Sequence, residues 1–476
     1  MARKQSFRRT RIVCTIGPAT CSLEIIKKLI MAGMDVARLN LSHGSRREHI
    51  DFIDGVRRVA AELGLPVSLL IDLPGPKYRT GPVSGTVTIK RGDLLTLTTR
   101  QVAGSSTQIS VNLPSFTDDV RPGDLILVDD GAIQLRAEKV ENTDVVARVL
   151  STALLSSGRG IVIPGGTVSG PFINKMFLEN AEFAASQNPD FIALSFVSRA
   201  DDVASARRYI QDKGGRAAIV AKIERHEALK ELDGILEMSD AVMVARGDLG
   251  VDIPLYDIPL AQKEIIRKCN RAGKPVITAT QMLESMVYAA RPTRAEVTDV
   301  ANAIFDGTDA VMLSGETAIG KHPVAAVKIM AAVARRTENA LPYHKMLLER
   351  GEWITRETDE LIAYNACYTA ETLGAKAIVA FTTSGSTVKR VAKYRPRVPV
   401  LALTPNQQVF GQVKLSWAVQ PALIAQPASV LGLFAEAERL VKEQSMASRG
   451  DLIVITGGVP VGVAGTTNLL KVETVT

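Results

Sequence analysis

Eight short apolar runs, rich in Val, Ile, Leu and Ala, recur along the first two thirds of the chain, with helical patterns between most of them. A nearly continuous apolar run is typical of a strand covered on both faces, as in a parallel sheet. Strands that alternate with helices form βα units, and eight such units close a (β/α)8 barrel, the TIM barrel. The helical patterns at 22–33 and 260–273 each end in Gly, a common C-terminal cap. The predicted strands cover residues 11–17, 35–41, 67–73, 191–197, 217–223, 241–247, 275–281 and 309–315.

The long gap between the third and fourth strands does not fit a simple crossover. Residues 74–166 are rich in Val, Thr, Gly and Asp and alternate polar with apolar residues, which predicts a small β domain inserted in the barrel. The barrel itself is assigned to residues 1–73 and 167–340. A fresh α/β pattern over residues 341–476 predicts a third domain. Its expected strands lie within residues 375–383, 398–405, 421–426 and 451–458.

Composition narrows the class of partner. The formal charge of +7 favours anionic partners, but acidic residues are interspersed throughout and aromatics make up only 5%, so small phosphorylated or carboxylated substrates are favoured over nucleic acid. No apolar run is long enough for a membrane helix. The basic N-terminus lacks signal-peptide features and is expected to be a solvated arm. Four cysteines without C-x-x-C spacing indicate a reducing cytoplasm.

Polar residues stand where nearly every predicted strand ends. Lys222 and Glu224, two residues apart at the end of an apolar strand, can project to the same side. Taken alone, this pair is also compatible with an ordinary salt bridge. Because the carboxyl ends of barrel strands meet at one mouth, the whole set predicts a catalytic ring. The set comprises Arg38, Asn40, Ser42, His43, Asp72, Ser195, Lys222, Glu224, Arg246, Asp248, Thr280, Gln281, Ser314 and Glu316.

The residue types in this ring indicate phosphoryl-transfer or enolate chemistry. Glu224 and Asp248 are carboxylates on neighbouring strands, suited to Mg²⁺ or Mn²⁺. Lys222 is a cation that could neutralise charge developing on a transferring group or an enolate. Arg38 and Arg79 could clamp phosphate or carboxylate. No set suggests a Ser-His-Asp nucleophile, and the five histidines form no metal-ligand pattern.

Long ordered motifs resemble those of the pyruvate kinase family. They are CTIGPAT, MDVARLNLSHG, GPKYRTG, VDDG, AKIERHEAL, MVARGDLGVDIP, NRAGKPVITATQMLESM, RPTRAEVTDVANAIFDGTDAVMLSGETA and YRPRVPVLALTP, and they cover most of the chain. The resemblance implies that the inserted domain is a small β-barrel lid and that the C-terminal domain is regulatory. It also implies a homotetramer that converts phosphoenolpyruvate and ADP into pyruvate and ATP with a divalent metal, the last step of glycolysis.

The resemblance further assigns roles in catalysis. Glu224 and Asp248 would hold Mg²⁺, and Lys222 would stabilise the phosphoryl transition state and the enolate. Arg38 would hold the transferring phosphate together with Arg79. The substrate carboxylate would be seated by Thr280, which is also placed to pass a proton to the enolate carbon, and by the backbone of three residues. These three are Ala245, Arg246 and Gly247.

Two further sites follow from the resemblance. ADP is expected near Asn40, His43, Arg79 and Arg159. The effector loop of the family corresponds to Phe381–Arg390 here, and small residues with free N–H groups at a helix start suit phosphate; an ordinary Gly-Ser turn is the alternative. Because the last loop, Gly457–Asn468, has no Lys or Arg, the expected effector is a sugar monophosphate or AMP, or there is none. The effector residues would be Thr382, Thr383, Ser384, Gly385, Ser386 and Thr387.

The chain departs from the family at two segments near the lid. Where many members read D-T-K-G-P-E, this chain reads DLPGPK (72–77). The potassium ligands of those members correspond to Asn40, Ser42, Asp72 and Leu73. We expect the ammonium of Lys77 to replace the charge of K⁺, so that K⁺ is not required, unless Lys77 merely faces solvent at the hinge. The second departure, INKMF (173–177), changes the start of a hinge-side helix.

Two other functions remain open at the level of sequence. A Mg²⁺-dependent aldolase or lyase acting on a 2-keto acid would explain the barrel and its carboxylates, but not the insertion or the third domain. A phosphometabolite sensor with a relic site would explain the domains, but every expected catalytic side chain is present.

Overall fold

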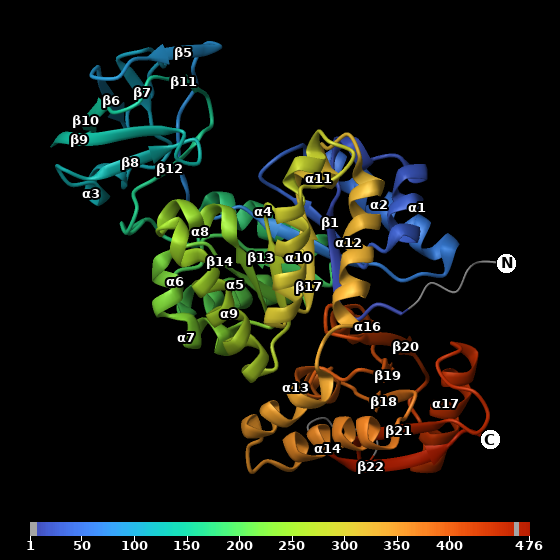
Figure 1. Ribbon diagram of the computed structural model, residues 1–476. Helices are drawn as coiled ribbons and strands as arrows, with labels where there is room; N and C mark the ends of the chain where they lie inside the picture. The colour runs from blue at the N-terminus through green and yellow to red at the C-terminus, as the bar shows by residue number, and fades with distance from the viewer. Residues whose placement is uncertain (1–6, 461–465) are drawn as a thin grey trace.

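A closed barrel of eight parallel strands forms the centre of the molecule (Figure 1). The structure is a computed structural model that describes residues 7–460 and 466–476. The strands follow one another around the barrel in the order β1-β17-β16-β15-β14-β13-β3-β2. Each lies within a predicted run and is buried along almost its whole length, as expected for strands covered on both faces. They are β1 Arg11–Thr15, β2 Val36–Asn40, β3 Ser68–Leu73, β13 Phe191–Leu194, β14 Ala218–Ile223, β15 Ala241–Ala245, β16 Val276–Ala279 and β17 Ala310–Leu313.

Helices α1 (Leu23–Ala32) and α9 (Ile258–Ala272) end at the two glycines that the sequence predicted. Ser22 accepts the N–H of Ile25 at the start of α1, and Gly33 ends the helix with a φ of 125°. Gly273 ends α9 in the left-handed conformation, with a φ of 67°. The helices are α1 Leu23–Ala32, α2 Arg46–Leu63, α4 Lys175–Ser186, α5 Ala200–Asp212, α6 His226–Lys230, α7 Leu232–Met238, α8 Arg246–Asp252, α9 Ile258–Ala272, α10 Arg294–Asp306, α11 Gly315–Ala318 and α12 Pro323–Glu338, with short 3-10 turns at Pro18–Thr20, Leu255–Asp257 and Glu284–Val287.

The altered segment at 173–177 still starts a capped helix. Asn174 precedes α4, and its side chain accepts the N–H of Phe177 at 2.9 Å. Asn is among the preferred N-cap residues, so it satisfies one of the free N–H groups of the first turn. Phe177 is buried against the barrel strands. Although residues 173–177 depart from the family pattern, α4 still begins with a capped first turn.

The inserted residues form a small β-barrel that stands away from the main barrel (Figure 1). Seven strands pair in the order β4-β12-β8-β9-β10-β6-β7, and β5 pairs with β11. The edges meet through a bridge between Thr80 and Val111 and a 2.7 Å hydrogen bond from Gly81 N–H to Ser110 O. The elements are β4 Tyr78–Arg79, β5 Thr86–Ile89, β6 Leu94–Thr98, β7 Gln108–Ser110, α3 Phe116–Asp119, β8 Leu125–Val128, β9 Ile133–Glu141, β10 Asp144–Val149, β11 Ala153–Ser156 and β12 Gly160–Val162.

The C-terminal domain lies at the opposite end of the barrel from the insertion (Figure 1). Its five-stranded sheet has the order β20-β19-β18-β21-β22, and the last strand, which the sequence did not predict, runs antiparallel to β21. The half-exposed pattern of β22 explains why the apolar-run criterion missed it. The elements are α13 Tyr343–Arg350, a 3-10 turn at Gly351–Trp353, α14 Thr358–Leu373, β18 Ala377–Phe381, α15 Ser386–Lys393, β19 Val400–Thr404, α16 Gln407–Val413, β20 Val419–Leu423, α17 Val430–Glu443, β21 Leu452–Gly458 and β22 Thr467–Thr474.

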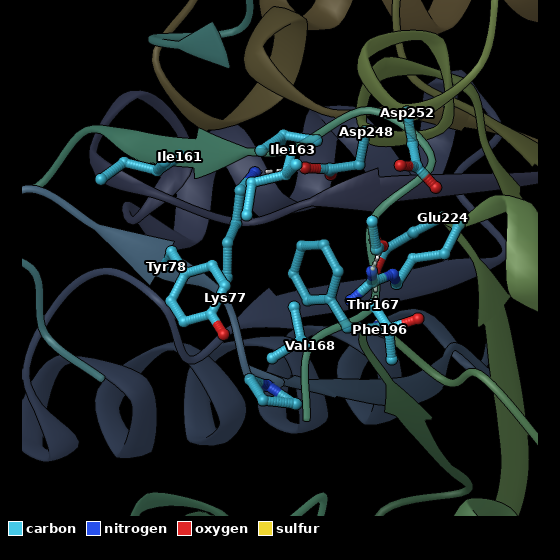
Figure 2. A pocket seen from close by; sticks show the side chains of 14 residues that line it. Lys77, Tyr78, Ile161, Ile163, Thr167, Val168, Phe196, Glu224, Asp248 and Asp252 are labelled. Carbon is cyan, nitrogen blue, oxygen red and sulfur yellow. Dashed lines mark hydrogen bonds and ion pairs between the residues drawn. The ribbon is translucent and has the colours of Figure 1, made fainter. Parts of the chain in front are cut away.

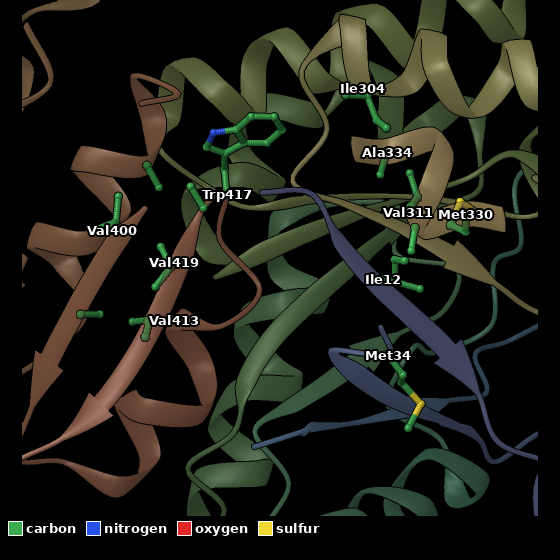
Figure 3. Close-up of a cluster of buried hydrophobic side chains, with 14 of the residues drawn as sticks. Ile12, Met34, Ile304, Val311, Met330, Ala334, Val400, Val413, Trp417 and Val419 are labelled. Carbon is green, nitrogen blue, oxygen red and sulfur yellow. The ribbon is translucent and has the colours of Figure 1, made fainter. Parts of the chain in front are cut away.

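One apolar core continues from the barrel into the C-terminal domain. Ile12 and Val311 of the barrel belong to the same buried cluster as Val400 and Trp417 (Figure 3). At its edge, Asp309 accepts bonds from the Arg395 guanidinium at 2.5 and 2.8 Å and from the N–H of Trp417 at 3.0 Å. The two domains therefore share a hydrophobic core and a buried ion pair.

The basic N-terminal segment is not a solvated arm from residue 7 onward, which corrects the expectation from sequence. Arg8 and Arg11 are buried and form ion pairs with Asp35, and Arg9 pairs with Glu338. Residues 1–6 lie outside the described residues. These arginines turn inward because the carboxylates of Asp35 and Glu338 pair with them. Composition alone does not reveal such partners. Within residues 7–460 and 466–476, none of the helices combines the length and apolar character that crossing a membrane requires.

Candidate active site

Strand β14 delivers Lys222 to the barrel mouth, and Glu224 follows one residue after the strand ends. The two residues are buried, with relative exposures of 8% and 1%. The Lys222 Nζ atom lies 2.8 Å from Glu224 Oε1 and 3.3 Å from Asp72 Oδ1, and it donates a 2.7 Å hydrogen bond to Ser195 Oγ. Lys222 thus belongs to a buried network that joins three strands rather than to an isolated surface pair.

Asp72 connects this network to Arg38. The Arg38 Nε atom donates to Asp72 Oδ2 at 2.9 Å, and its Nη1 atom donates to Thr15 Oγ1 at 2.8 Å. Ser195 Oγ donates to the other oxygen, Asp72 Oδ1, at 3.2 Å. Both carboxylate oxygens of Asp72 are therefore engaged, and the two cations are held in fixed positions at the mouth.

Backbone geometry that the sequence analysis missed fixes the Glu224 carboxylate. Phe196 adopts a left-handed φ of 58°, which is costly for an aromatic residue, and its N–H donates to Glu224 Oε2 at 2.6 Å. A Cβ atom on Gly75 would lie 2.1 Å from the carbonyl oxygen of Ser195, so the entry to the insertion passes directly against this loop. The glycine between two prolines at 74–76 is the one sequence signal that could have indicated this close approach.

The end of β16 and the start of α8 form the next part of the mouth. Thr280 has a φ of 67°, and its hydroxyl accepts the N–H of Gly247 at 2.8 Å. The Arg246 guanidinium turns away, to Asp299 at 2.7 and 2.8 Å and to the Thr280 carbonyl oxygen at 2.7 Å. Ala245 ends β15 directly before α8. Arg246 can therefore offer a ligand its backbone, since its side chain is already bound.

Asp248 and Glu224 face the same small cavity between the insertion and the barrel (Figure 2). Its volume is about 30 Å³, enough for one ion or water. Lys77 enters from the insertion, and its Nζ atom lies 2.5 Å from Asp248 Oδ1. Tyr78 and Ile161 of the insertion and Phe196 of the barrel supply apolar walls.

The surrounding charges separate the pKa values of these two carboxylates. Burial raises the pKa of Glu224, and the negative charge of Asp248 adds to the rise. Burial also acts on Asp248, but the ammonium groups of Lys77 and Lys222 hold its pKa below the usual value. Burial opposes the charge on Lys222, yet Asp72 and Glu224 together raise its pKa, so Lys222 remains a cation at neutral pH.

The donor set fits a hard divalent cation. Glu224 Oε1 is buried, and the Lys222 ammonium lies 2.8 Å from it. Among the residues that the structure describes, no group of three or more His, Cys, Asp or Glu side chains could hold a metal. Two carboxylates at one cavity suit Mg²⁺ or Mn²⁺, which keep several positions for water and substrate oxygens.

Comparison with known proteins decides the family. A family model described as the pyruvate kinase barrel domain matches residues 7–327, and one described as the pyruvate kinase alpha/beta domain matches residues 360–473. Proteins named pyruvate kinase from Staphylococcus aureus strains MRSA252 and USA300 are each 44% identical over 472 residues, covering 98% of this chain and 81% of theirs. The chain belongs to the pyruvate kinase family.

A solved structure agrees in fold. The crystal structure of a pyruvate kinase from Cryptosporidium parvum superimposes with a TM-score of 0.92 at 36% identity, covering 98% of this chain and 96% of that one. The predicted combination of (β/α)8 barrel, inserted β domain and C-terminal α/β domain is confirmed. The chain is therefore an enzyme of a phosphotransferase family, and the inserted domain is called the lid below.

The residues that the pyruvate kinase resemblance assigned to ADP lie partly at the mouth and partly in the lid. Arg79 on β4 lowers the pKa of His43, after burial, which is the larger cause. Asn40 Oδ1 accepts the N–H of Ser42 at 3.1 Å. Arg159 pairs with Asp129 at 3.1 Å within the lid. The structure brings Arg79 and His43 into electrostatic range, whereas the contacts of Arg159 stay within its own domain.

The Lys77 ammonium lies at Asp248 rather than at the residues that match a pyruvate kinase potassium site. These residues are Asn40, Ser42, Asp72 and Leu73. The ammonium of Lys77 contacts Asp248 and lies over the Phe196 ring, while Asp72 is bound by Lys222 and Arg38. The Leu73 side chain packs into the barrel core, and its carbonyl accepts the Ser195 N–H at 3.3 Å. The short β3–β4 connection directs the Lys77 ammonium across the mouth to Asp248.

The predicted effector loop forms a tight turn before α15. Gly385 has a φ of 88°, and its N–H donates to Thr382 Oγ1 at 2.8 Å. The hydroxyls of Thr387 and Thr467 lie 2.7 Å apart. Ser384 is exposed, and its hydroxyl donates to Ser386 at 3.1 Å. Residues 461–465 of the last loop, on which the expected effector class depends, lie outside the described residues.

Proposed function

We propose that the chain transfers the phosphoryl group of phosphoenolpyruvate to ADP, with Mg²⁺ or Mn²⁺, giving pyruvate and ATP at the end of glycolysis. The observation that carries this proposal is the buried Lys222 ammonium beside Glu224 and Asp72, at a cavity shared by Glu224 and Asp248. Phosphoryl transfer demands positioning and electrostatic stabilisation rather than a protein nucleophile. A fixed cation next to a two-carboxylate metal site supplies both.

Each residue of the mouth has a defined task in this reaction. Arg38, braced by Asp72 and Thr15, binds and orients the transferring phosphate with Arg79. Lys222 faces the charge that develops on the phosphoryl group and on the enolate left behind. When bound at Glu224 and Asp248, the divalent cation supplies Lewis-acid polarisation of substrate oxygens. The pKa of Lys222 is raised, so its side chain keeps its positive charge at neutral pH.

The substrate carboxylate is seated by α8 and Thr280. The backbone at Ala245, Arg246 and Gly247 faces Thr280, whose hydroxyl accepts the Gly247 N–H. The Thr280 hydroxyl is also the proposed route, through water, for the proton that the enolate carbon receives. The left-handed φ of 67° at Thr280 holds the hydroxyl in place.

A coupled assay tests the proposal. The enzyme is supplied with phosphoenolpyruvate, Mg²⁺ and either ADP or no nucleotide, and pyruvate is followed through lactate dehydrogenase. We expect pyruvate to form only when ADP and Mg²⁺ are both present. Pyruvate formation without ADP would indicate a lyase or phosphatase. If neither phosphoenolpyruvate nor ADP is consumed, the protein would be a sensor.

The family and the surface support a proposal about assembly and location. We propose a homotetramer that acts in the cytoplasm. Leu255 and Tyr256, in the 3-10 turn before α9, and Leu260, in α9, are 76%, 79% and 67% exposed, which suits a surface that subunits cover. All four cysteines are free, as a reducing compartment favours.

We expect activity without monovalent cations and with full dependence on Mg²⁺. Lys222 and Arg38 already compensate Asp72, and Leu73 has no hydroxyl to offer, so the four-residue set has little need of K⁺. Conversely, Lys77→Glu replaces a cation near the mouth with the glutamate of the family pattern, so it should create a potassium requirement.

The potassium assay compares potassium chloride with tetramethylammonium chloride at equal ionic strength, which keeps screening constant. Activation by potassium above ~10-fold, equal to about 1.4 kcal/mol of barrier, would contradict the expectation. The Lys77→Glu variant measured in both salts serves as the matched comparison.

The effector prediction concerns the loop before α15. We expect a sugar monophosphate or AMP to bind at residues 382–387, or no effector at all, because the last loop brings no cation for a second phosphate. Ser384 is exposed and available to a phosphate. Strong activation by fructose 1,6-bisphosphate that a Ser384→Glu variant abolishes would overturn this expectation. Binding is measured by calorimetry and activation by the coupled assay.

A further inference from the structure

Lys77 joins the lid to the barrel through a residue of the metal site (Figure 2). Its Nζ atom lies 2.5 Å from Asp248 Oδ1, and its side chain is only 12% exposed. The same atom lies 5.2 Å from the centroid of the Phe196 ring, within range of a cation–π contact. Residue 77 stands immediately before β4, the first strand of the lid. One ammonium group thus bridges two domains at their hinge.

The methylene chain of Lys77 is also confined, because it passes close to the backbone of Gly160. A Cβ atom placed on Gly160, in the last lid strand β12, would lie 2.6 Å from Lys77 Cε and 3.1 Å from its Nζ atom. The absence of a side chain at Gly160 therefore leaves the room through which Lys77 reaches Asp248. The Phe196 ring supports the ammonium on the barrel side. Both the strand that leaves the lid and a barrel loop thus hold this contact in place.

We propose that Lys77 is an internal counter-cation that competes with the divalent metal for Asp248, so that metal binding releases Lys77 and its lid connection from the barrel. This inference rests on the metal site of the proposed function. An ammonium in contact with Asp248 Oδ1 and a divalent cation at the same carboxylate would repel each other inside a cavity of about 30 Å³. Without metal, Lys77 compensates a carboxylate that burial alone would disfavour. Lys77 thereby sets the metal affinity and couples metal occupancy to the lid hinge.

The first test measures Mn²⁺ binding to the free enzyme by electron paramagnetic resonance, without substrates. Lys77→Met keeps the length of the side chain and removes the competing charge, so we expect the Kd for Mn²⁺ to fall at least ~10-fold, the lower end of the effect of one close opposite charge on a carboxylate. Lys90→Met, an exposed lid position, is the matched control and should leave the Kd unchanged.

Gly160→Ala provides a second variant that keeps the lysine. The φ of Gly160 lies outside the left-handed region, and the three atoms nearest to the added Cβ all belong to the flexible end of Lys77, so the backbone accepts alanine. We expect Mn²⁺ to bind more tightly than in the wild type, by less than in Lys77→Met. This variant carries the test if Lys77→Met fails to fold, as thermal unfolding would reveal.

The second test reads the release of Lys77 directly. Acetylation of lysines, located by mass spectrometry, should be slow at Lys77 without metal and faster once Mg²⁺ is added, with Lys90 unchanged. Mn²⁺ affinity equal to or weaker than wild type in both variants, or Lys77 acetylation that ignores Mg²⁺, would overturn the competition. Wild-type enzyme that binds no Mn²⁺ would overturn the metal site and this inference with it, which distinguishes the two failures.

Discussion

Replacing Lys222 with Met lowers kcat by at least ~10²-fold, the cost of losing one preorganised electrostatic donor. The ammonium is buried between Glu224 and Asp72, so water cannot take its place at the moment of transfer. Because the methionine keeps the length of the side chain, the change removes charge rather than shape. The KM for phosphoenolpyruvate should change much less, since the interaction is strongest in the transition state.

The control for this variant is Lys230→Met. Lys230 is an exposed lysine at the end of α6, a few residues from Lys222 in the chain. We expect wild-type kcat for it. A near-normal kcat for Lys222→Met, in enzyme with unchanged thermal unfolding, would reduce the Lys222–Glu224 contact to a structural ion pair.

Replacing Glu224 with Gln should weaken Mn²⁺ binding and lower kcat at subsaturating Mg²⁺, each by at least ~10²-fold. The change keeps an acceptor for the Phe196 N–H but removes the negative charge of the buried carboxylate. Hard cations depend on anionic oxygen ligands, so the neutral amide is a poor replacement. Mutation of a residue that only supports a metal ligand typically lowers metal affinity or activity by about 10- to 100-fold. Loss of a ligand itself should therefore lower them more.

Dependence on magnesium concentration separates this variant from Lys222→Met. Raising Mg²⁺ should restore part of the activity of Glu224→Gln and none of that of Lys222→Met. Glu231→Gln, at an exposed position after α6, is the matched control and should retain wild-type metal affinity. Unchanged Mn²⁺ binding in Glu224→Gln would exclude Glu224 as a metal ligand.

The barrel and the ring at its mouth could be predicted because both depend on local pattern. Strand β14 is fully buried, so its apolar run was readable, and Lys222 stands out as the charged residue within it. The spacing of Lys222 and Glu224 then follows from strand geometry. The closing order of strands follows once eight βα units are counted.

Other features depend on contacts between distant segments and were not predictable. Lys77 and Asp248 are separated by 171 residues, and nothing in DLPGPK indicates which carboxylate the lysine will meet. The left-handed backbone of Phe196 and Thr280 is imposed by the surrounding site against the preference of those residues. The burial of Arg8 likewise could not be predicted without knowing that Asp35 is its partner.

The fate of the phosphoryl group distinguishes transfer to ADP from hydrolysis and from elimination. Phosphoenolpyruvate labelled with ³²P is incubated with the enzyme, ADP and Mg²⁺, and the labelled products are separated while pyruvate is measured in the same samples. We expect the label to appear in the terminal phosphate of ATP in an amount equal to that of pyruvate, and we expect omission of ADP or Mg²⁺ to stop the formation of both. Label released as inorganic phosphate, or pyruvate formed without labelled ATP, would contradict this expectation.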